Sequence, residues 1–107
     1  MHPHTALVRA CLLKLGSRPD MLVWQNTTGV FQTKTGGAVT VGLVGSPDII
    51  GLWRYRQVVT IPILIECKTG NATQSKQQRA FARRASELGA QVHVVRSVED
   101  LDAIYPP

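Results

Sequence analysis

The chain has little cysteine and no long apolar run, and both shortages narrow the classes of protein to which it can belong. Cys11 and Cys67 are its 2 cysteines, and no CxxC or Cys/His spacing is present, so neither a zinc site nor a disulfide framework is indicated. Each lies beside apolar residues, which favours two buried free thiols and a reducing cytoplasm. No stretch approaches the roughly 20 apolar residues of a membrane span, and Met1–His4 lacks the features of a signal peptide.

Familiar ligand-binding motifs are also missing. No GxGxxG or GxxxxGK[ST] pattern passes through Gly36–Gly45, which argues against a nucleotide-binding fold. The histidines are not spaced for zinc, and His93, in an apolar strand, is interpreted as structural. Trp24 and Trp53 follow apolar residues and are interpreted as core or strand-end packing rather than platforms for stacking bases.

Positive charge, by contrast, is in excess. Twelve Lys and Arg against seven Asp and Glu give a net charge of +5, which favours a polyanionic partner such as nucleic acid. The 107 residues are 44% hydrophobic, enough for one core. We therefore expect one domain over residues 1–107, without a membrane partner.

Apolar periodicity predicts helices over 5–15, 75–88 and 98–104 and strands over 22–24, 49–53, 58–67 and 91–95. Residues 26–45 are rich in Thr and Gly, so we expect mostly a mobile or ligand-ordered loop with one β-prone patch at 38–41. The strands around Arg54–Gln57 form a hairpin, with Pro62 at a bulge or an edge because it cannot donate a hydrogen bond. The predicted fold is α/β, a mixed sheet flanked by helices.

Two carboxylates mark the ends of the predicted hairpin. Asp48 begins one strand, and Glu66 lies two residues before Lys68 on the other, so Glu66 and Lys68 share a face while Ile65 and Cys67 point to the core. A buried acid and lysine need partners, and a divalent cation with oxygen ligands can satisfy both acids. A simple Pro-Asp turn and a solvated ion pair at a strand end are the alternative.

The second predicted helix brings a glutamine toward these acids. Phe81, Ala85 and Leu88 recur at helical spacing and are expected to face the sheet, with Gln78 on the same stripe one turn earlier. The alternative role for Gln78 is a capping box with Ser75, in which its side chain reaches back to a backbone amide. The sequence supports both roles equally.

A basic stripe occupies another face of the same helix, formed by Lys76, Arg79 and Arg83. It suits a surface that follows a DNA backbone, although a solvated charged face is the commoner meaning of such a stripe. Lys34, in the Gly-rich segment, can add to this footprint. The candidate DNA-binding residues are Asn26, Lys34, Ser46, Ser75, Lys76, Arg79 and Arg83.

Taken together, three motifs resemble those of the VRR-NUC domain, a branch of the PD-(D/E)xK nuclease superfamily: Gly45-Ser46-Pro47-Asp48, Glu66-Cys67-Lys68 and Ser75-Lys76-Gln77-Gln78. Asn26-Thr27-Thr28-Gly29 is similar to the Asn-x-x-Gly turn that precedes the first motif there. The resemblance extends from the first helix to Val95–Asp100. It implies a restriction-endonuclease-like fold, in which a mixed β-sheet is flanked by α-helices.

The resemblance implies a Mg²⁺- or Mn²⁺-dependent DNA endonuclease that acts on branched, Holliday-junction-like DNA in replication, repair or recombination. Asp48, Glu66 and the backbone carbonyl of Cys67 are then the metal ligands. Lys68 lies beside the attacking water, and Gln78 orients that water or the phosphate. These four side chains, Asp48, Glu66, Lys68 and Gln78, are the candidate catalytic residues.

Domains of this size resemble viral and bacterial members of the family, which implies a homodimer in the cytoplasm of a bacterium or a virus-infected cell. The family often carries a metal-binding glutamate in its first helix. Thr5–Val8 offers none, which leaves His4 or a water as the replacement and the number of metal ions open. Two other classes also stay open: a non-catalytic DNA-binding module with this fold, and a subunit that recruits a helicase or recombination protein.

Overall fold

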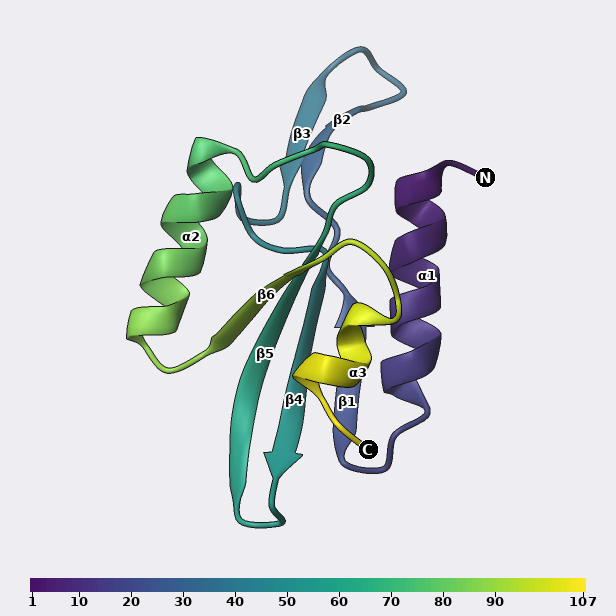
Figure 1. The fold of residues 1–107 in the computed structure, drawn as a ribbon. Coiled ribbons are helices and arrows are strands. Elements are labelled where there is room, and N and C mark those ends of the chain that lie inside the picture. Colours follow the sequence, from purple (N-terminus) through teal and green to yellow (C-terminus); the bar gives the residue numbers. More distant parts are fainter.

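The computed structural model describes residues 1–107 and is built on a four-stranded mixed sheet with the strand order β1-β4-β5-β6 (Figure 1). Its strands are β1 (Met21–Gln25), β4 (Ile49–Tyr55), β5 (Val59–Cys67) and β6 (Gln91–Val95). β4 pairs antiparallel with β1 and β5, while β6 pairs parallel with β5. β2 (Gly29–Gln32) and β3 (Ala38–Val41) form a separate two-stranded sheet. The predicted mixed α/β architecture is confirmed.

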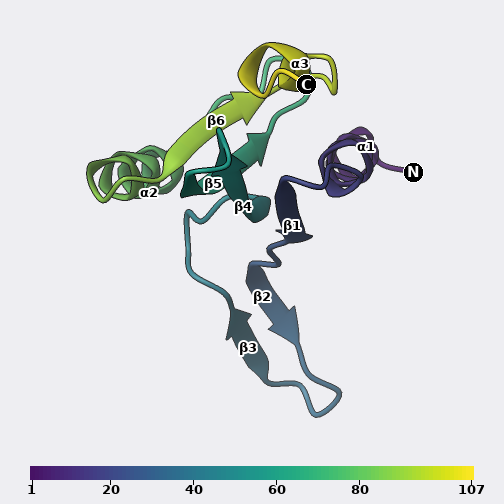
Figure 2. The same ribbon diagram turned by 90° about the horizontal axis from the view of Figure 1, so that it is seen from below.

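Helices cover both faces of the larger sheet. α1 (Pro3–Gly16) and α3 (Asp100–Ile104) pack on one face, and α2 (Lys76–Glu87) lies along β6 on the other (Figure 2). The inner stripe of α1 is formed by Val8, Cys11 and Leu15, which recur at i, i+3 and i+7 and are all buried. None of the helices combines the length and apolar character that crossing a bilayer requires.

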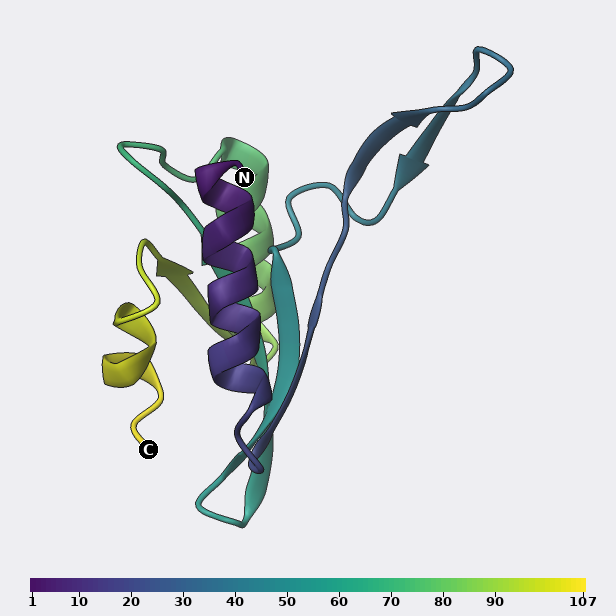
Figure 3. The same ribbon diagram turned by 90° about the vertical axis from the view of Figure 1, so that its right-hand side faces the viewer.

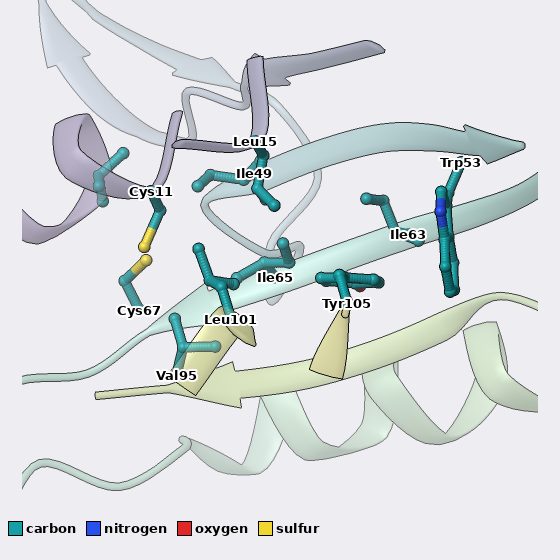
Figure 4. Close-up of a cluster of buried hydrophobic side chains, with 11 residues drawn as sticks. Cys11, Leu15, Ile49, Trp53, Ile63, Ile65, Cys67, Val95, Leu101 and Tyr105 are labelled. Carbon is teal, nitrogen blue, oxygen red and sulfur yellow. The ribbon is translucent and has the colours of Figure 1, made fainter. Parts of the chain in front are cut away.

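The hydrophobic core fills the space between α1, α3 and the sheet (Figure 4). Alternate residues of β5 enter it, because successive side chains of a strand point to opposite faces; Ile63, Ile65 and Cys67 have no exposed surface. Cys11 and Cys67 are both buried and free, and their sulfur atoms face each other in Figure 4. The prediction of two buried free thiols is thus confirmed.

The β4–β5 hairpin has the predicted register. Ile49 pairs with Ile65, so Asp48 and Glu66 stand at the same end of the ladder. The β5–β6 pairing begins only at Ile63, so Pro62 lies where β5 has a neighbour on one side alone. Its missing N–H therefore costs no ladder hydrogen bond. The edge position is confirmed, and the uninterrupted register shows no bulge.

Residues 26–45 differ from the expected loop. Residues 29–41 within this segment form an antiparallel hairpin of β2 and β3, here called the arm, with Phe31 opposite Val39, and the arm projects from the rest of the molecule (Figure 3). This projection raises the radius of gyration to 14.7 Å, against about 13 Å for a compact chain of this length. The sequence signal for β2 was weak, because Gly29–Gln32 holds only two β-prone residues.

Two packing predictions were wrong. Leu88 is 71% exposed, because α2 ends at Glu87 and the capping residue turns outward. Trp24 is 45% exposed, because it lies on β1, at the sheet edge opposite the β6 edge along which α2 packs. Periodicity identified the apolar stripe in each case but not how far the neighbouring layer extends.

Candidate active site

Five polar or charged side chains gather near the end of the sheet where α1 and α2 begin, which lies below the arm in the upper half of Figure 1. Asp48 directly precedes β4. Glu66 is the penultimate residue of β5, and Lys68 directly follows that strand. Gln78 stands in the first turn of α2 and His4 in the first turn of α1. Four separate elements thus contribute to one site.

Glu66 is the most confined of these groups, with 4% of its surface exposed. Burial and, to a smaller extent, the nearby Asp48 carboxylate raise its pKa to about 7, although the Lys68 ammonium opposes both effects. The Lys68 Nζ lies 4.0 Å from the Glu66 Oε1. Two acids with one lysine leave an excess of negative charge, which favours binding of a cation at this point.

Asp48 joins the start of β4 to the end of β5. Its Oδ2 accepts a hydrogen bond from the Cys67 N–H at 2.8 Å. The His4 Nε2 lies 3.3 Å from the same oxygen, and the Asp48 side chain keeps 22% exposure. The carboxylate is therefore anchored on one side and open to a ligand on the other.

Gln78 performs both of its predicted roles at once. Its Oε1 accepts from the Ser75 N–H at 2.8 Å, and the Ser75 Oγ accepts from the Gln78 N–H at 3.1 Å, which completes the capping box. The same Oε1 accepts from the Lys68 Nζ at 2.9 Å, while Nε2 donates to the Glu66 Oε1 at 2.9 Å. The cap of α2 therefore fixes the lysine relative to the acid.

Asn26 organises the loop before Asp48. Its Nδ2 donates to the Ser46 Oγ at 2.7 Å and to the Pro47 carbonyl at 2.8 Å, and its N–H donates to the Asp48 carbonyl at 2.7 Å. Asn26 and Ser46 therefore hold the chain on which Asp48 stands. Their predicted contacts with DNA stay predictions.

Sequence reasoning missed how tightly this loop packs on α2. Gly45 has φ +84°, and a Cβ there would lie 2.5 Å from the Gln77 carbonyl oxygen. The loop before Asp48 thus rests on the helix turn that carries Gln78. The glycine in Gly45-Ser46-Pro47-Asp48 was the available signal, but only the tertiary structure shows its neighbour.

The basic residues fall into two places. Lys76, Arg79 and Arg83 are exposed along α2, which begins at the site, and the Arg79 Nη1 donates to the Gln74 carbonyl at 2.7 Å. Lys34 is exposed in the turn between β2 and β3, and this turn is the far end of the projecting arm in Figure 3. The basic residues of α2 therefore adjoin the site, whereas the distance of Lys34 from the site depends on the orientation of the arm.

The donor set suits a cation that keeps much of its water. No group of three or more His, Cys, Asp and Glu side chains is arranged to hold a metal ion. Asp48, Glu66 and the Cys67 carbonyl offer oxygen ligands only, since the Cys67 sulfur faces the core (Figure 4). Mg²⁺ commonly binds through one or two carboxylates plus waters and substrate phosphates, so these residues fit Mg²⁺ or Mn²⁺.

Comparison of the chain with protein-family models, with curated proteins and with solved structures found no match. The structure itself shows a mixed α/β protein with two acids, a lysine and a glutamine at one end of its sheet.

Proposed function

We propose that the protein is a Mg²⁺- or Mn²⁺-dependent endodeoxyribonuclease of the PD-(D/E)xK type. The observation that carries the proposal is the joint placement of Asp48, Glu66 and Lys68, with Gln78 hydrogen-bonded to the last two. Three motifs far apart in the sequence meet at one sheet end. Isolated turns or ion pairs do not require this convergence.

The acidic and the basic side chains of the site would have different roles in the reaction. Asp48, Glu66 and the Cys67 carbonyl would hold the cation, which would polarise the scissile phosphate and activate a bound water. The Lys68 ammonium, held by the Gln78 Oε1 at 2.9 Å, would stabilise negative charge that develops on the phosphate. Gln78 acts as a positioning residue for Lys68 and Glu66.

DNA is the substrate that the charge distribution favours. The net charge is +5 although the site itself is acidic, so the remaining surface is more basic than the total suggests. Lys76, Arg79 and Arg83 project from the helix that carries Gln78, where they can contact phosphates next to the cleavage point.

A homodimer is part of the proposal, with a second copy covering the arm. Phe31, Val39 and Val41 share one face of the arm and are each 39–47% exposed. A lone two-stranded hairpin is at best marginally stable in water, so this face needs a cover. Two copies related by a two-fold axis would place two cleavage centres on one branched DNA.

The test is a cleavage assay on linear, flapped and four-way-junction DNA with Mg²⁺, Mn²⁺ or EDTA. We expect metal-dependent cleavage, strongest on branched DNA, and losses of about 1,000-fold in Asp48→Asn and Glu66→Gln, because metal-ion charge stabilisation is worth several kcal/mol. Asp48→Asn retains an oxygen acceptor for the Cys67 N–H, which protects the fold. Asp102→Asn removes a distant acid paired with Lys14 and serves as the control.

Two results would contradict the proposal. Near-wild-type turnover in either site variant would show that the acids do not hold the metal. DNA binding without cleavage under every metal condition would favour the non-catalytic module, or a subunit that recruits a helicase or recombination protein.

A further inference from the structure

The larger sheet has an apolar surface that no helix covers. Leu22 pairs with Leu52, and Trp24 lies two residues further along β1, so the three side chains point away from the core on the same side of the sheet. They are 41–62% exposed, and Pro62, which pairs with Leu52, is exposed as well. α2 lies along β6 and leaves β1 and β4 uncovered on this side (Figure 2). These four residues are called the open face below.

The open face and the arm lie in a part of the chain that carries almost no charge. The chain has 12 Lys and Arg and 7 Asp and Glu, yet only Lys34 and Asp48 lie between Met21 and Trp53. Surfaces that bind DNA are rich in Lys and Arg, whereas the centres of protein interfaces are depleted of charge and enriched in aromatic residues. Both apolar surfaces therefore suit a protein partner.

The arm does not cover the open face of its own copy. Asn26, between β1 and β2, makes three hydrogen bonds to residues 46–48, which fix the chain where it leaves the sheet. β2 and β3 pair only with each other, and the arm extends away from β1 and β4 (Figures 2 and 3). One copy therefore presents two separate apolar surfaces, a two-stranded ribbon and a sheet face.

We propose that the arm of each copy packs its Phe31, Val39 and Val41 face on the open face of a second copy, in a reciprocal two-fold exchange. The inference rests on the homodimer of the proposed function and adds the surface that receives the arm, but it does not depend on the metal chemistry. Around a two-fold axis each copy gives one arm and receives one, so both apolar surfaces of both copies are covered.

The available area is what a stable dimer needs. Six apolar side chains of each copy take part, each 39–62% exposed: Leu22, Trp24, Phe31, Val39, Val41 and Leu52. At roughly 60–120 Å² for each half-exposed side chain, two copies bury about 1,000 Å² from these residues alone. A specific interface starts at about this value, and the backbone and threonines of the arm add to it.

The exchange places the received arm on the same side of the sheet as the candidate active site. Pro62, Leu64 and Glu66 alternate along β5, so Glu66 and the open face belong to one surface. α2 flanks this surface along β6, and the received arm flanks it along β1 and β4. A DNA strand at the site would then lie between α2 and the arm of the second copy.

The test mixes two variants in the absence of metal and DNA. The sheet variant is Leu22→Ser with Leu52→Ser, and the arm variant is Phe31→Ser with Val39→Ser. Each variant weakens both contacts of its own homodimer, so its dimer Kd should rise by about 100-fold or more. A mixed dimer keeps one wild-type arm on one wild-type face. Sedimentation velocity should therefore show dimers in the 1:1 mixture at a concentration where each variant alone is monomeric.

Packing of arm against arm predicts a different result: the sheet variant would dimerise normally and the mixture would show no recovery. Leu13→Ser replaces a leucine on α1 that is 77% exposed, and this control should leave the dimer Kd unchanged. A wild type that stays monomeric, normal dimerisation of the sheet variant, or a mixture without recovery would overturn the exchange.

Trp24 gives a second measurement that needs no variant. As the wild type is concentrated into the dimer range, the emission of Trp24 should shift to the blue and its quenching by acrylamide should fall, while Trp53, already buried, gives a constant background. Dimers that leave Trp24 unprotected would overturn the exchange. Protection of Trp24 by single-stranded DNA in a protein that stays monomeric would assign the open face to nucleic acid instead. Loss of cleavage with an intact exchange would contradict only the proposed chemistry.

Discussion

The candidate active site and the arm are joined by a short segment, residues 42–47, but they differ in how many other elements hold them in place. At the site, Glu66 is 4% exposed and is fixed by Gln78, which α2 supplies. In the arm, every residue of β2 and β3 is exposed. Outside its own ladder, the arm's hydrogen bonds stay within its turn, around Thr33.

This difference shows which part of the molecule is fixed by contacts with the core and which part is not. The site draws side chains from several elements that the core already fixes, so the fold itself sets its geometry. The arm has only its own two strands, which do not bury enough apolar surface for independent stability. The fold therefore holds the site on several sides, whereas the arm is held only through its own ladder and turn.

Lys68→Ala gives the largest expected effect and tests the candidate active site. The cleavage rate should fall by about 10²–10⁴-fold, the range for a single group that assists proton transfer or charge development. Mn²⁺ binding should persist, because lysine is not a ligand. Single-turnover kinetics together with calorimetry measure both quantities, with Lys76→Ala as the exposed control. Parallel loss of Mn²⁺ binding would contradict the separate role of Lys68.

Substitution on the apolar face of the arm should separate the two copies. Phe31→Ser with Val39→Ser removes two side chains worth about 1.5–3 kcal/mol each when buried, which weakens the dimer by about 100-fold or more. Sedimentation equilibrium measures this change. Val30→Ser, on the opposite face of the same strand, is the matched control. A wild type that is monomeric at all micromolar concentrations would remove the arm from any subunit contact.

Two glycines allow a direct comparison of the regions. Gly45 and Gly36 both have positive φ, at +84° and +88°, but a Cβ at Gly36 has no neighbour within 4 Å. Both alanine variants carry the backbone cost of roughly 1–2 kcal/mol. Gly45→Ala should lose more stability and also activity, since it must displace Gln77 and the turn that carries Gln78. Equal losses in thermal unfolding and kcat would show that this contact does not position the site.

Lys34→Glu gives the smallest expected effect. If the turn of the arm meets one phosphate, the slope of log K against log salt should flatten by about 0.9. Cleavage at saturating DNA should stay unchanged, because the arm holds none of the reacting groups. Fluorescence anisotropy over a salt series measures the slope. A slope equal to that of the wild type would exclude Lys34 from the DNA-binding surface.

Much of the site was predictable from short-range patterns. The alternation around Glu66 and Lys68 and the hairpin between β4 and β5 are local patterns that place both acids at one end of the sheet, as the structure confirms. Gln78 was less determined, because its two roles appeared as alternatives; the structure shows that one amide group satisfies both. The roles of Asn26 and Gly45 depend on partners 20 or more residues away, which local periodicity does not reveal.

By itself, the sequence determined the order of most helices and strands, the buried face of β5 and the hairpin that brings Asp48 and Glu66 to the same end of the sheet. These features depend on side-chain period and on turn residues close in the chain. Only the tertiary structure decided that His4 meets Asp48, that Leu88 and Trp24 stay exposed, and that residues 29–41 form a projecting arm. Those outcomes depend on where each layer ends and which surface remains uncovered, and both are properties of packing between distant segments.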